Sequence, residues 1–421
     1  MIDTSAWDWD PGTRTIAEIS RCDSEIEWRE ESQASPDGEK VAAVVKTGDM
    51  EFGMCVNETL LEARHERIWY PRYAPDGRLV VIAVDDGEYT LSIDGEALEE
   101  YYGFIWETRF SKDGSVIASA LQDSMTYGML VDGKPWETMF DNANNFALSP
   151  KGNASAAAVQ TVSMGQAEIY KFQEGAYSVA IDGTPWERNF VNVWTPVFND
   201  EGTSVAAQVR TSLYDYTIAV DGTPWPQQYA SVWEPCFKPG GKEVFAPVKL
   251  NGKWGMAADG NIVWDPSFVQ LWQPQFSSDG QTLAAICAPK FGLWTVAVNG
   301  TPWEKTFTDM VTDLRVSKNG RTVAAIGKDD GKWFVCVNGT TWSAGCDMAW
   351  QPIISADGGH VAAKVEQGGK HLILVDGKPY AEKFDEAWDP TFSQDGTKVL
   401  IRAIKDGKFV RIVELVANIT G

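Results

Sequence analysis

Residues 271–304 read LWQPQFSSDGQTLAAICAPKFGLWTVAVNGTPWE, and the rest of the chain repeats their pattern. Two apolar runs, 282–287 and 293–298, are bounded by Asp279-Gly280 and Asn299-Gly300. Such pairs favour tight hairpin turns, because the central residues of these turns need positive φ, which Gly and Asn tolerate best. Four short runs separated by turns of this kind predict two hairpins, that is, a four-stranded antiparallel sheet.

The same unit recurs along nearly the whole chain. One glycine closes the first turn of each copy, at Gly38, Gly77, Gly114, Gly152, Gly202, Gly241, Gly280, Gly320, Gly358 and Gly396. Ten copies of a four-stranded unit near 40 residues long are typical of propeller blades, and no 3.6-residue apolar spacing indicates helical repeats instead. We therefore predict an all-β propeller of ten four-stranded repeats. The even spacing and the incomplete last repeat favour a single ring over two five-bladed rings.

The ends of the chain and one insertion complete the domain organisation. Residues 31–421 hold the ten repeats, but the last repeat, 388–416, supplies only three strands. We expect residues 1–30 to complete that last sheet, since this would remove an exposed strand edge. Repeat four carries an insertion at 161–175, between its second and third strands. We interpret it as a loop or extended hairpin on the rim, either a tolerated surface insertion or a partner contact.

Composition excludes several classes of partner. The 59 acidic and 36 basic residues give a net charge of −23, which argues against binding to nucleic acid or to an anionic membrane surface. No apolar run approaches the roughly 20 residues that span a bilayer, and the start MIDTSAWDWDPG does not resemble a secretory signal. If this start is native, we expect a cytoplasmic protein that is peripheral to the inner membrane only through its partners.

Tryptophan is frequent, and its position in the repeat explains sixteen of the 19 copies. Seven lie eight residues before the first-turn glycine, at Trp69, Trp106, Trp194, Trp233, Trp272, Trp350 and Trp388. Six begin the fourth strand, at Trp136, Trp186, Trp225, Trp264, Trp303 and Trp342, and three precede the second turn, at Trp254, Trp294 and Trp333. Registered indoles predict packing between neighbouring blades, because each ring buries roughly 150–250 Å². The alternative for the first seven is an exposed ring of indoles that binds a flat ligand or a partner.

The motif F-S-x-D-G-x-x-V-A-A, whose F-S-x-D-G part is seen at 276–280 and 392–396, resembles the WD-like, TolB-type propeller repeat. This resemblance covers residues 30–416 and indicates the fold but not the function. The tryptophan-rich chain is also similar to the D-subunit family of the transmembrane redox complex Tmc of sulfate-reducing bacteria, on size, Trp content and repeat type. That resemblance implies a cofactor-free propeller that accompanies a cytochrome c, an iron–sulfur subunit and a membrane cytochrome b.

Residues that could carry chemistry are few. The three histidines, His65, His360 and His371, are scattered, and no C-x-x-C, G-x-S-x-G, H-E-x-x-H or phosphate-binding loop is present. We interpret His371, which occupies an aromatic register, as a packing residue. Repetition marks the second-turn aspartates as turn formers, namely Asp94, Asp132, Asp182, Asp221, Asp259 and Asp376. The unregistered acids Glu107, Glu234 and Asp389 follow the first-strand Trp position and could line the channel mouth.

We therefore expect no catalytic, cofactor or metal site, and a non-catalytic interaction or scaffold subunit of a membrane-associated electron-transfer complex. Its expected partners are proteins, namely redox subunits with a membrane anchor. The candidate interaction surface comprises the Trp residues outside the registers and part of the insertion: Trp7, Trp9, Trp28, Glu168, Tyr170 and Phe172. One alternative is a propeller enzyme, a hydrolase or a quinone-dependent dehydrogenase, with acids at the channel mouth. Another is a periplasmic TolB-like accessory protein.

Overall fold

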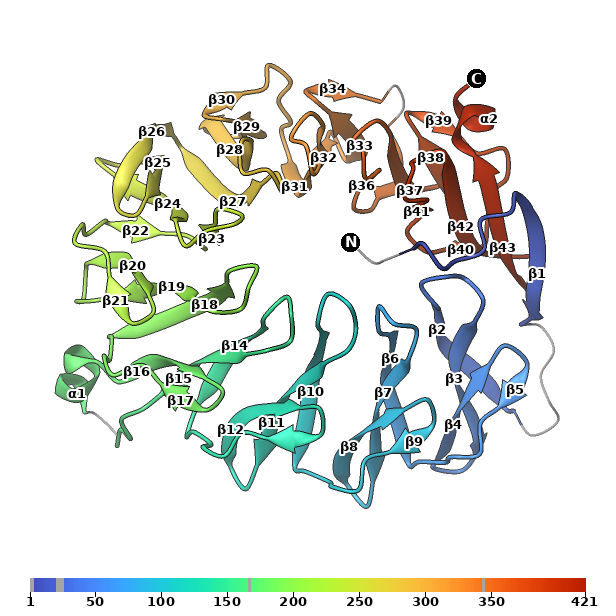
Figure 1. Cartoon of the computed structure of the whole chain (residues 1–421), viewed down its shortest axis with the longest axis horizontal. Coiled ribbons are helices and arrows are strands. Elements are labelled where there is room, and N and C mark those ends of the chain that lie inside the picture. Colours follow the sequence, from blue (N-terminus) through green and yellow to red (C-terminus); the bar gives the residue numbers. More distant parts are fainter. Residues whose placement is uncertain (1–3, 20–25, 166–167, 343–344) are drawn as a thin grey trace. The chain divides into compact units, whose positions relative to one another are not determined.

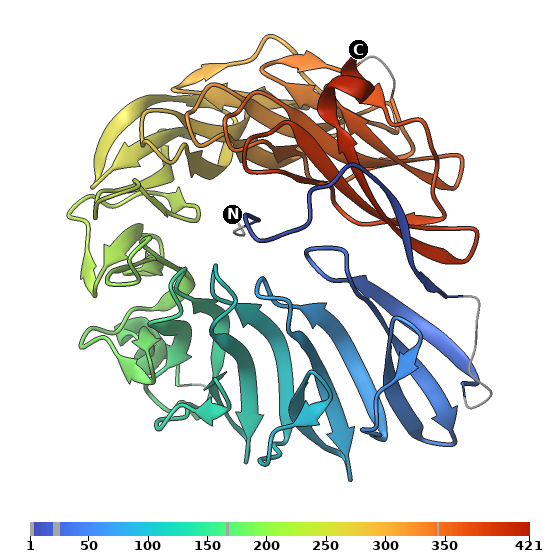
Figure 2. The same cartoon turned by 45° about the vertical axis from the view of Figure 1, so that its right-hand side comes forward.

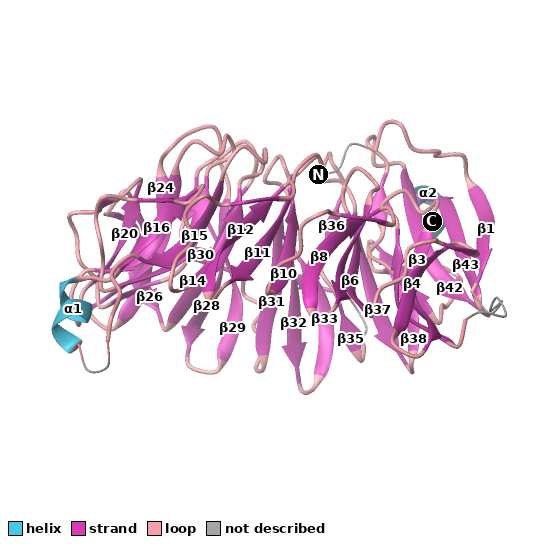
Figure 3. Cartoon of the chain, turned by 90° about the horizontal axis from the view of Figure 1, so that it is seen from below, coloured by secondary structure: helices cyan, strands magenta, loops and turns pink. Residues whose placement is uncertain are grey.

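The computed structural model describes residues 4–19, 26–165, 168–342 and 345–421. Its strands form ten antiparallel sheets, which are called blades 1 to 10 in chain order (Figure 1). The helices of the described residues are short, α1 (Ile169–Glu174) and α2 (Val416–Thr420) (Figure 3). The chain divides into two compact units of five blades each, unit 1 (Met1–Gly103 with Asp309–Gly421) and unit 2 (Phe104–Thr308). The predicted fold class, an all-β propeller of ten four-stranded repeats, is confirmed.

Unit 2 holds blades 3 to 7. Their strands are β10 (Phe104–Phe110), β11 (Ile117–Asp123), β12 (Thr126–Val131) and β13 (Lys134–Pro135); β14 (Ala143–Leu148), β15 (Ser155–Gln160), β16 (Tyr177–Ile181) and β17 (Thr184–Pro185); β18 (Asn192–Phe198), β19 (Val205–Arg210), β20 (Tyr216–Val220) and β21 (Thr223–Pro224); β22 (Ser231–Val232), β23 (Cys236–Phe237), β24 (Val244–Leu250), β25 (Lys253–Ala258) and β26 (Asn261–Phe268); and β27 (Gln270–Phe276), β28 (Leu283–Lys290), β29 (Leu293–Val298) and β30 (Thr301–Pro302).

Unit 1 holds blades 1, 2, 8, 9 and 10. Their strands are β2 (Trp28–Ala34), β3 (Val41–Gly48), β4 (Glu51–Val56) and β5 (Thr59–Leu60); β6 (Arg67–Tyr73), β7 (Leu79–Asp85), β8 (Glu88–Ile93) and β9 (Glu96–Ala97); β31 (Met310–Val316), β32 (Val323–Asp329), β33 (Lys332–Val337) and β34 (Thr340–Thr341); β35 (Met348–Ala349), β36 (Ile353–Ile354), β37 (Val361–Gln367), β38 (Lys370–Val375) and β39 (Lys378–Pro379); and β40 (Glu386–Ala387), β41 (Thr391–Phe392), β42 (Lys398–Lys405), β43 (Lys408–Leu415) and β1 (Gly12–Glu18).

The first strand is split in two in blades 6, 9 and 10. The break falls at a Trp-x-Pro sequence in each of them, with Pro235, Pro352 and Pro390 between the two pieces. Proline has no backbone N–H to donate to the ladder, but Trp-x-Pro also lies within the unbroken strands β6, β18 and β27, so the proline alone does not account for the break.

Blade 10 takes its outermost strand from the amino-terminal end of the chain. Strand β1 pairs antiparallel with β43, from Gly12 opposite Val413 to Glu18 opposite Lys408 (Figure 2). It thereby supplies the strand that the last repeat lacks and covers an edge that could otherwise pair with another chain. Blade 10 also contacts blade 1 within unit 1. Blade 1 therefore has the neighbour that a single ten-bladed propeller gives it, and not the neighbour expected in two consecutive five-bladed rings.

In nine blades, the turn between the third and fourth strands contains an Asp or Asn. Its side chain accepts a hydrogen bond from the backbone N–H at the start of the second strand. In blade 3, Asp132 has φ +45° and its carboxylate accepts the N–H of Ile117 at 2.8 Å. The same contact is made by Asn57, Asp94, Asp182, Asp221, Asp259, Asn299, Asn338 and Asp376. The interpretation of the six repeated aspartates as turn formers is confirmed.

Indoles join neighbouring blades at the fourth strand. Trp186 of blade 4 lies over Gly222 of blade 5, where an added Cβ would come within 3.3 Å of the ring. The rings of Trp264 and Trp342 lie over the corresponding glycines Gly300 and Gly377 in the same way. At Gly183 and Gly260, the nearby tryptophan atom is the Cβ of Trp136 and of Trp225. Trp136 also donates its Nε1 hydrogen to the Ser155 hydroxyl of the next blade at 2.8 Å. The prediction of blade-to-blade packing is confirmed at these positions.

The first-strand indoles behave differently from that prediction. Trp233 stacks on Trp254 of its own blade, with ring centres 5.6 Å apart and 13° between the planes. Trp194 stacks on Tyr216 of its own blade in the same way. The rings of Trp272 and Trp350 are tilted against Trp294 and His371, and those of Trp106 and Trp388 meet Tyr127 and Phe409 edge-on. Trp106 also meets Phe146 of the next blade, at 5.6 Å. First-strand indoles therefore mainly join the first and third strands of one blade.

Candidate functional site

The candidate interaction residues of the amino-terminal segment lie in unit 1. The rings of Trp7 and Trp9 stack on each other at 6.2 Å with 19° between their planes, and both are half-buried. Trp9 Nε1 donates to the backbone carbonyl of Thr4 at 2.9 Å. These two indoles therefore order the segment that precedes β1.

Trp28, the third candidate of unit 1, begins β2 and does not join that pair. Its side chain is 38% exposed and meets Phe52 of the same blade edge-on, with ring centres 5.7 Å apart.

The insertion of repeat four forms the short helix α1, so the expected loop or extended hairpin is wrong in this respect. The run from Glu168 to Glu174 contains neither Gly nor Pro, which permits a helical turn. Glu168 accepts the Gly165 N–H at 2.7 Å and pairs with Lys171 at 2.8 Å. The Lys171 ammonium, with the Gly165 N–H, lowers the pKa of Glu168. Glu168 is thus engaged within the insertion.

The other two candidates of the insertion differ in exposure. The side chain of Phe172 is half-buried, whereas Tyr170 is 82% exposed. Tyr170 is therefore the candidate of this segment that is best placed to contact a partner.

Exposed apolar side chains occur at every second-to-third-strand hairpin of unit 2. We call this set the tip surface; it comprises Met125, Ile169, Tyr170, Leu213, Tyr214, Leu250 and Phe291. Phe291 is 92% exposed and Tyr214 is 81% exposed. Figure 3 shows α1 and the β28–β29 hairpin along the same edge of the strands. In unit 1, the corresponding turns of blades 2, 8, 9 and 10 end in Asp-Gly or Gly-Gly, and only that of blade 1 carries an exposed apolar residue among the described residues, Met50, which is 58% exposed.

The sequence analysis missed most of this surface because it treated the turns as connections. A signal was present, since the tip position is a small polar turn in four repeats and a large apolar residue in others. Large exposed apolar residues that cluster are more informative than scattered ones, because clusters mark interaction sites.

Met125 occupies a backbone conformation that opposes its side chain. It has φ +67°, and Ser124 before it has φ +49°. The matching turn position holds Gly252 in blade 6 and Gly292 in blade 7. A left-handed conformation costs a non-glycine residue about 1–2 kcal/mol. Because Met125 is 76% exposed, little packing within the chain offsets that cost.

Charge is balanced around the tip surface, although the whole chain carries −23. The charged residues of these turns and their flanks are Asp123, Glu168, Lys171, Glu174, Arg210, Asp215, Lys249, Lys253 and Lys290. Several are used locally: Arg210 Nε donates to the Ser212 carbonyl at 3.1 Å, and Asp215 accepts the Ser212 hydroxyl at 2.6 Å. The surface is therefore apolar and close to neutral.

A cavity of about 480 Å³ lies in unit 2 along the first strands of blades 3 to 6. It brings together two of the three acids suggested for a channel mouth, Glu107 and Glu234, with Arg109, Asn145 and Thr195. We call these five residues the acid cup. Apolar side chains, Phe146 and Phe198 among them, complete the lining.

Three of the cup residues each lie at a β-bulge of their own first strand. Glu107, Asn145 and Thr195 have φ +56°, +52° and +42°, and the ladder shifts register at each of them. A bulge re-aims a side chain that a regular strand would direct elsewhere. The repeat position directly after the first-strand Trp, which drew attention to Glu107 and Glu234, could also have predicted Asn145 and Thr195. Arg109 carries no such signal.

The two carboxyls of the cup have unlike surroundings. Arg109 lies 3.3 Å from Glu107. Glu234 keeps part of its side chain in solvent through the open side of the cup, but the surrounding wall desolvates its carboxyl and raises its pKa. The third suggested acid, Asp389, does not belong to the cup; it lies in unit 1, 3.9 Å from Lys364.

The histidines are engaged in structural contacts. His371 packs against Trp350 with ring centres 5.4 Å apart, so its interpretation as a packing residue is confirmed. His65 and His360 each place Nδ1 2.7 Å from a carboxylate, Asp85 and Asp376. Among the described residues, no three His, Cys, Asp or Glu side chains gather as a metal site would require. A search of the same residues found no helix with the length and apolar character needed to cross a bilayer.

No protein-family model matches the chain, and no curated protein matches it. Among solved structures, it is similar to one titled "Crystal structure of the eukaryotic initiation factor", with 10% identity and a TM-score of 0.43 over 91% of this chain and 93% of that chain. It is also similar to one titled "Structure of Dos1 propeller", with 13% identity and a TM-score of 0.37 over 96% of this chain and 95% of that chain. At these scores, neither likeness bears on function.

Proposed function

We propose that this protein is a non-catalytic scaffold that binds a protein partner through the tip surface of unit 2. The observation that supports this function best is the unbroken series of exposed apolar residues, one or more on each of five successive blades. Hairpin tips built for solubility alone would resemble the Asp-Gly and Gly-Gly tips of blades 2, 8, 9 and 10. Met125 adds to the case, because its left-handed backbone costs stability and its exposed side chain gains little packing within the chain in return.

The partner that fits this surface presents an apolar contact area. The balanced local charge makes electrostatic steering weak there, and it spares an acidic partner the repulsion expected from the chain as a whole. We further propose that this partner is a redox subunit with a membrane anchor. Support for that class comes from the resemblance of the tryptophan-rich sequence to the D subunit of the Tmc complex.

Affinity capture from native membranes with single tip variants tests this function. We expect Tyr170→Asp, Tyr214→Asp and Phe291→Asp each to reduce the amount of one captured partner at least tenfold, since each places a charge in an apolar contact. Val263→Asp is the matched control, because Val263 is 48% exposed but lies on β26, away from the hairpin tips. Equal capture by wild type and all three tip variants would refute the proposed surface.

The acid cup supports a second candidate function, a propeller hydrolase. A carboxyl with a raised pKa in the same cavity as one paired with an arginine is the kind of arrangement that separates a general acid from a carboxylate. A panel of chromogenic glycosides and esters tests it. The hydrolase requires turnover that Glu234→Gln abolishes, whereas the scaffold predicts that no substrate of the panel is turned over.

A further inference from the structure

A second cavity, of about 270 Å³, lies in unit 1 where blades 1, 2 and 10 meet the amino-terminal segment. Its lining includes Arg402 of β42, Arg72 and Tyr73 of β6, Trp7, and Pro36 from the first turn of blade 1. The cavity therefore combines cationic, hydroxyl and apolar groups from segments far apart in the sequence.

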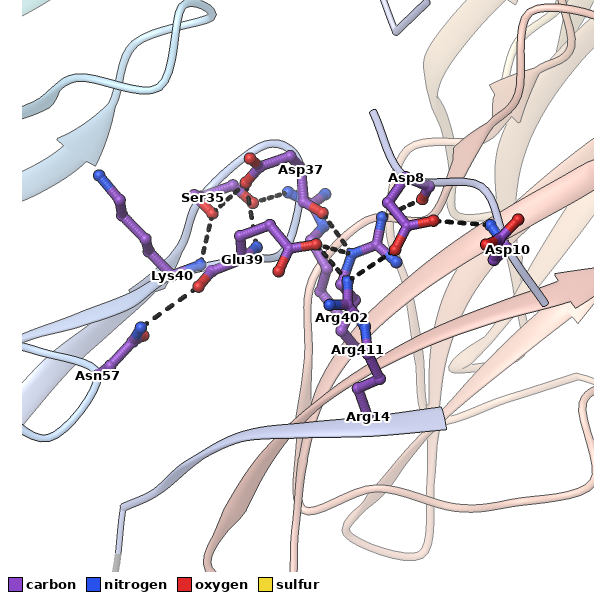
Figure 4. A network of polar contacts seen from close by, with 10 residues as sticks. All are labelled: Asp8, Asp10, Arg14, Ser35, Asp37, Glu39, Lys40, Asn57, Arg402 and Arg411. Carbon is purple, nitrogen blue, oxygen red and sulfur yellow. Dashed lines mark hydrogen bonds and ion pairs between the residues drawn. The ribbon is translucent and has the colours of Figure 1, made fainter. Parts of the chain in front are cut away.

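Arg402 is the charged residue of this cavity that lacks a counter-ion. It lies directly opposite Arg411 in the β42–β43 ladder, and like charges in such positions repel each other. Arg411 has Glu39 at 3.0 Å. Arg402 instead donates Nη1 to the Ser35 carbonyl at 3.0 Å (Figure 4). Its Nη2 donates to the Asp389 carbonyl at 2.6 Å. Among the described residues, no carboxylate forms an ion pair with it.

Two donors at this cavity remain without an acceptor in the described part of the chain. They are Nε of Arg402 and the hydroxyl of Tyr73, and both atoms are buried. A guanidinium offers five N–H groups, of which Arg402 uses two in the bonds above. Burial lowers the pKa of Arg402 to about 10, although Asp389 and Asp37 act against this shift from a distance. Buried cations and hydroxyls without partners are costly, so this arrangement favours an added acceptor with negative charge.

We propose that this cavity binds a small organic oxyanion, a carboxylate or a phosphate monoester, with Arg402 and Tyr73 as its donors. Arg72 adds positive charge at the same wall. Trp7 and Pro36 supply an apolar side, against which the body of such a ligand packs. A guanidinium suits this chemistry because its planar fork matches the oxygens of carboxylate and phosphate.

This site gives Trp7 a role different from the one expected from the sequence. Trp7 was a candidate for contact with a protein partner, but it lines this second cavity and stacks on Trp9. Ligand binding would therefore also hold the segment before β1 against blades 1 and 10.

Isothermal titration of the full chain with benzoate, phenyl phosphate and inorganic phosphate tests the site. We expect benzoate or phenyl phosphate to bind with 1:1 stoichiometry, and inorganic phosphate to bind at least tenfold more weakly because it has no apolar body. Tyr73→Phe should weaken binding about fivefold, as expected for the loss of one hydrogen bond. Arg402→Lys and Arg72→Gln should each weaken it about tenfold or more.

Arg14→Gln serves as the matched control, because Arg14 is an exposed arginine that pairs with Asp8 and Glu39 and is not part of the cavity lining. It should change the affinity less than twofold. Absence of binding by both organic anions, or equal binding by wild type, Tyr73→Phe and Arg72→Gln, would overturn the proposal. Tyr73→Phe and Arg72→Gln decide the outcome even if Arg402→Lys fails to fold. Equal affinity for phenyl phosphate and inorganic phosphate would show that the apolar side formed by Trp7 and Pro36 does not contribute to binding.

Discussion

Arg411 and Glu39 join the last blade to the first, with the guanidinium 3.0 Å from the carboxylate. The side chain of Arg411 is 2% exposed, and its Nε also donates to the Asp37 carbonyl at 2.8 Å (Figure 4). Burial lowers the pKa of Arg411, and the Glu39 carboxylate opposes that shift. Near the same place, Gly38 has φ +75°, and an added Cβ would lie 3.0 Å from the Arg402 stem and 3.2 Å from that of Arg411. The junction therefore depends on contacts between residues more than 350 positions apart.

The junction predicts an unequal cost for removing its two charges. Glu39→Ala leaves a buried guanidinium without its nearest carboxylate and should lower the free energy of unfolding by about 3 kcal/mol. Arg411→Met removes the buried charge itself and leaves Glu39 in partial contact with water, so its cost should be about 1–2 kcal/mol. Arg14→Gln, at a surface position, should cost less than about 1 kcal/mol. Urea unfolding measures the order, and a larger loss for Arg411→Met than for Glu39→Ala would contradict it.

Fourth-strand indoles should matter more for stability than first-strand ones. Trp225 is 6% exposed and belongs to the apolar core that includes Val244 and Ala257 of the next blade, so Trp225→Ala should cost about 3–5 kcal/mol. Trp69 is 39% exposed, and Trp69→Ala should cost less than half as much. Chemical denaturation of the two variants under the same conditions compares them. Equal losses would mean that the two registers pack alike.

Local chemistry made the fold predictable. Turn glycines and Asx residues mark each hairpin, because few other residues tolerate positive φ. The packing of the fourth-strand Trp residues was predictable for a related reason, since a large ring at the same position of six repeats needs an equivalent neighbour in the next repeat. The stacking of first-strand rings within a blade was not predictable, because Trp233 and Trp254 meet only once the strand register is known. The helix α1 was missed because its residues break the repeat and have no second copy for comparison.

Met125 should lower the stability of the fold and strengthen binding of the partner. Met125→Gly relieves a left-handed backbone conformation and should raise the free energy of unfolding by up to about 1 kcal/mol. The same change removes an exposed apolar side chain from the tip surface and should weaken capture of the partner. Thermal unfolding measures the first effect and quantitative capture of the partner measures the second, both on the same preparation. A variant that is less stable than wild type would show that the methionine side chain serves the fold.

The Ser-x-Asp-Gly turns should contribute to unfolding in acid. The Ser111 hydroxyl, followed by the N–H and hydroxyl of Ser115, lowers the pKa of Asp113 from 3.8 to about 2. A carboxyl with a lowered pKa in the folded state stabilises that state above the pKa of the unfolded chain, and this stabilisation is lost as the pH falls from about 4 to about 2. Asp113→Asn should therefore flatten the dependence of the unfolding free energy on pH in that window. Parallel curves for variant and wild type would contradict this role.

The candidate sites were predictable only in part. Glu107 and Glu234 drew attention because they break a repeated pattern, and the structure brings them into one cup. Arg402 and Tyr73 could not be found in this way, since neither stands in a motif and their cavity forms only when blades 1, 2 and 10 meet. A missing counter-ion is a property of three-dimensional surroundings, which no local pattern reports.

Site-specific photo-cross-linking in native cells tests the proposed docking surface most directly. A photoreactive aromatic residue is placed at Tyr214, at Phe291 and, as a control, at Tyr70, which is 67% exposed but lies on β6 rather than at a hairpin tip of unit 2. The proposed function predicts that positions 214 and 291 yield an adduct with the same protein and that position 70 does not. No adduct at either tip position, or the same adduct at position 70, would contradict it.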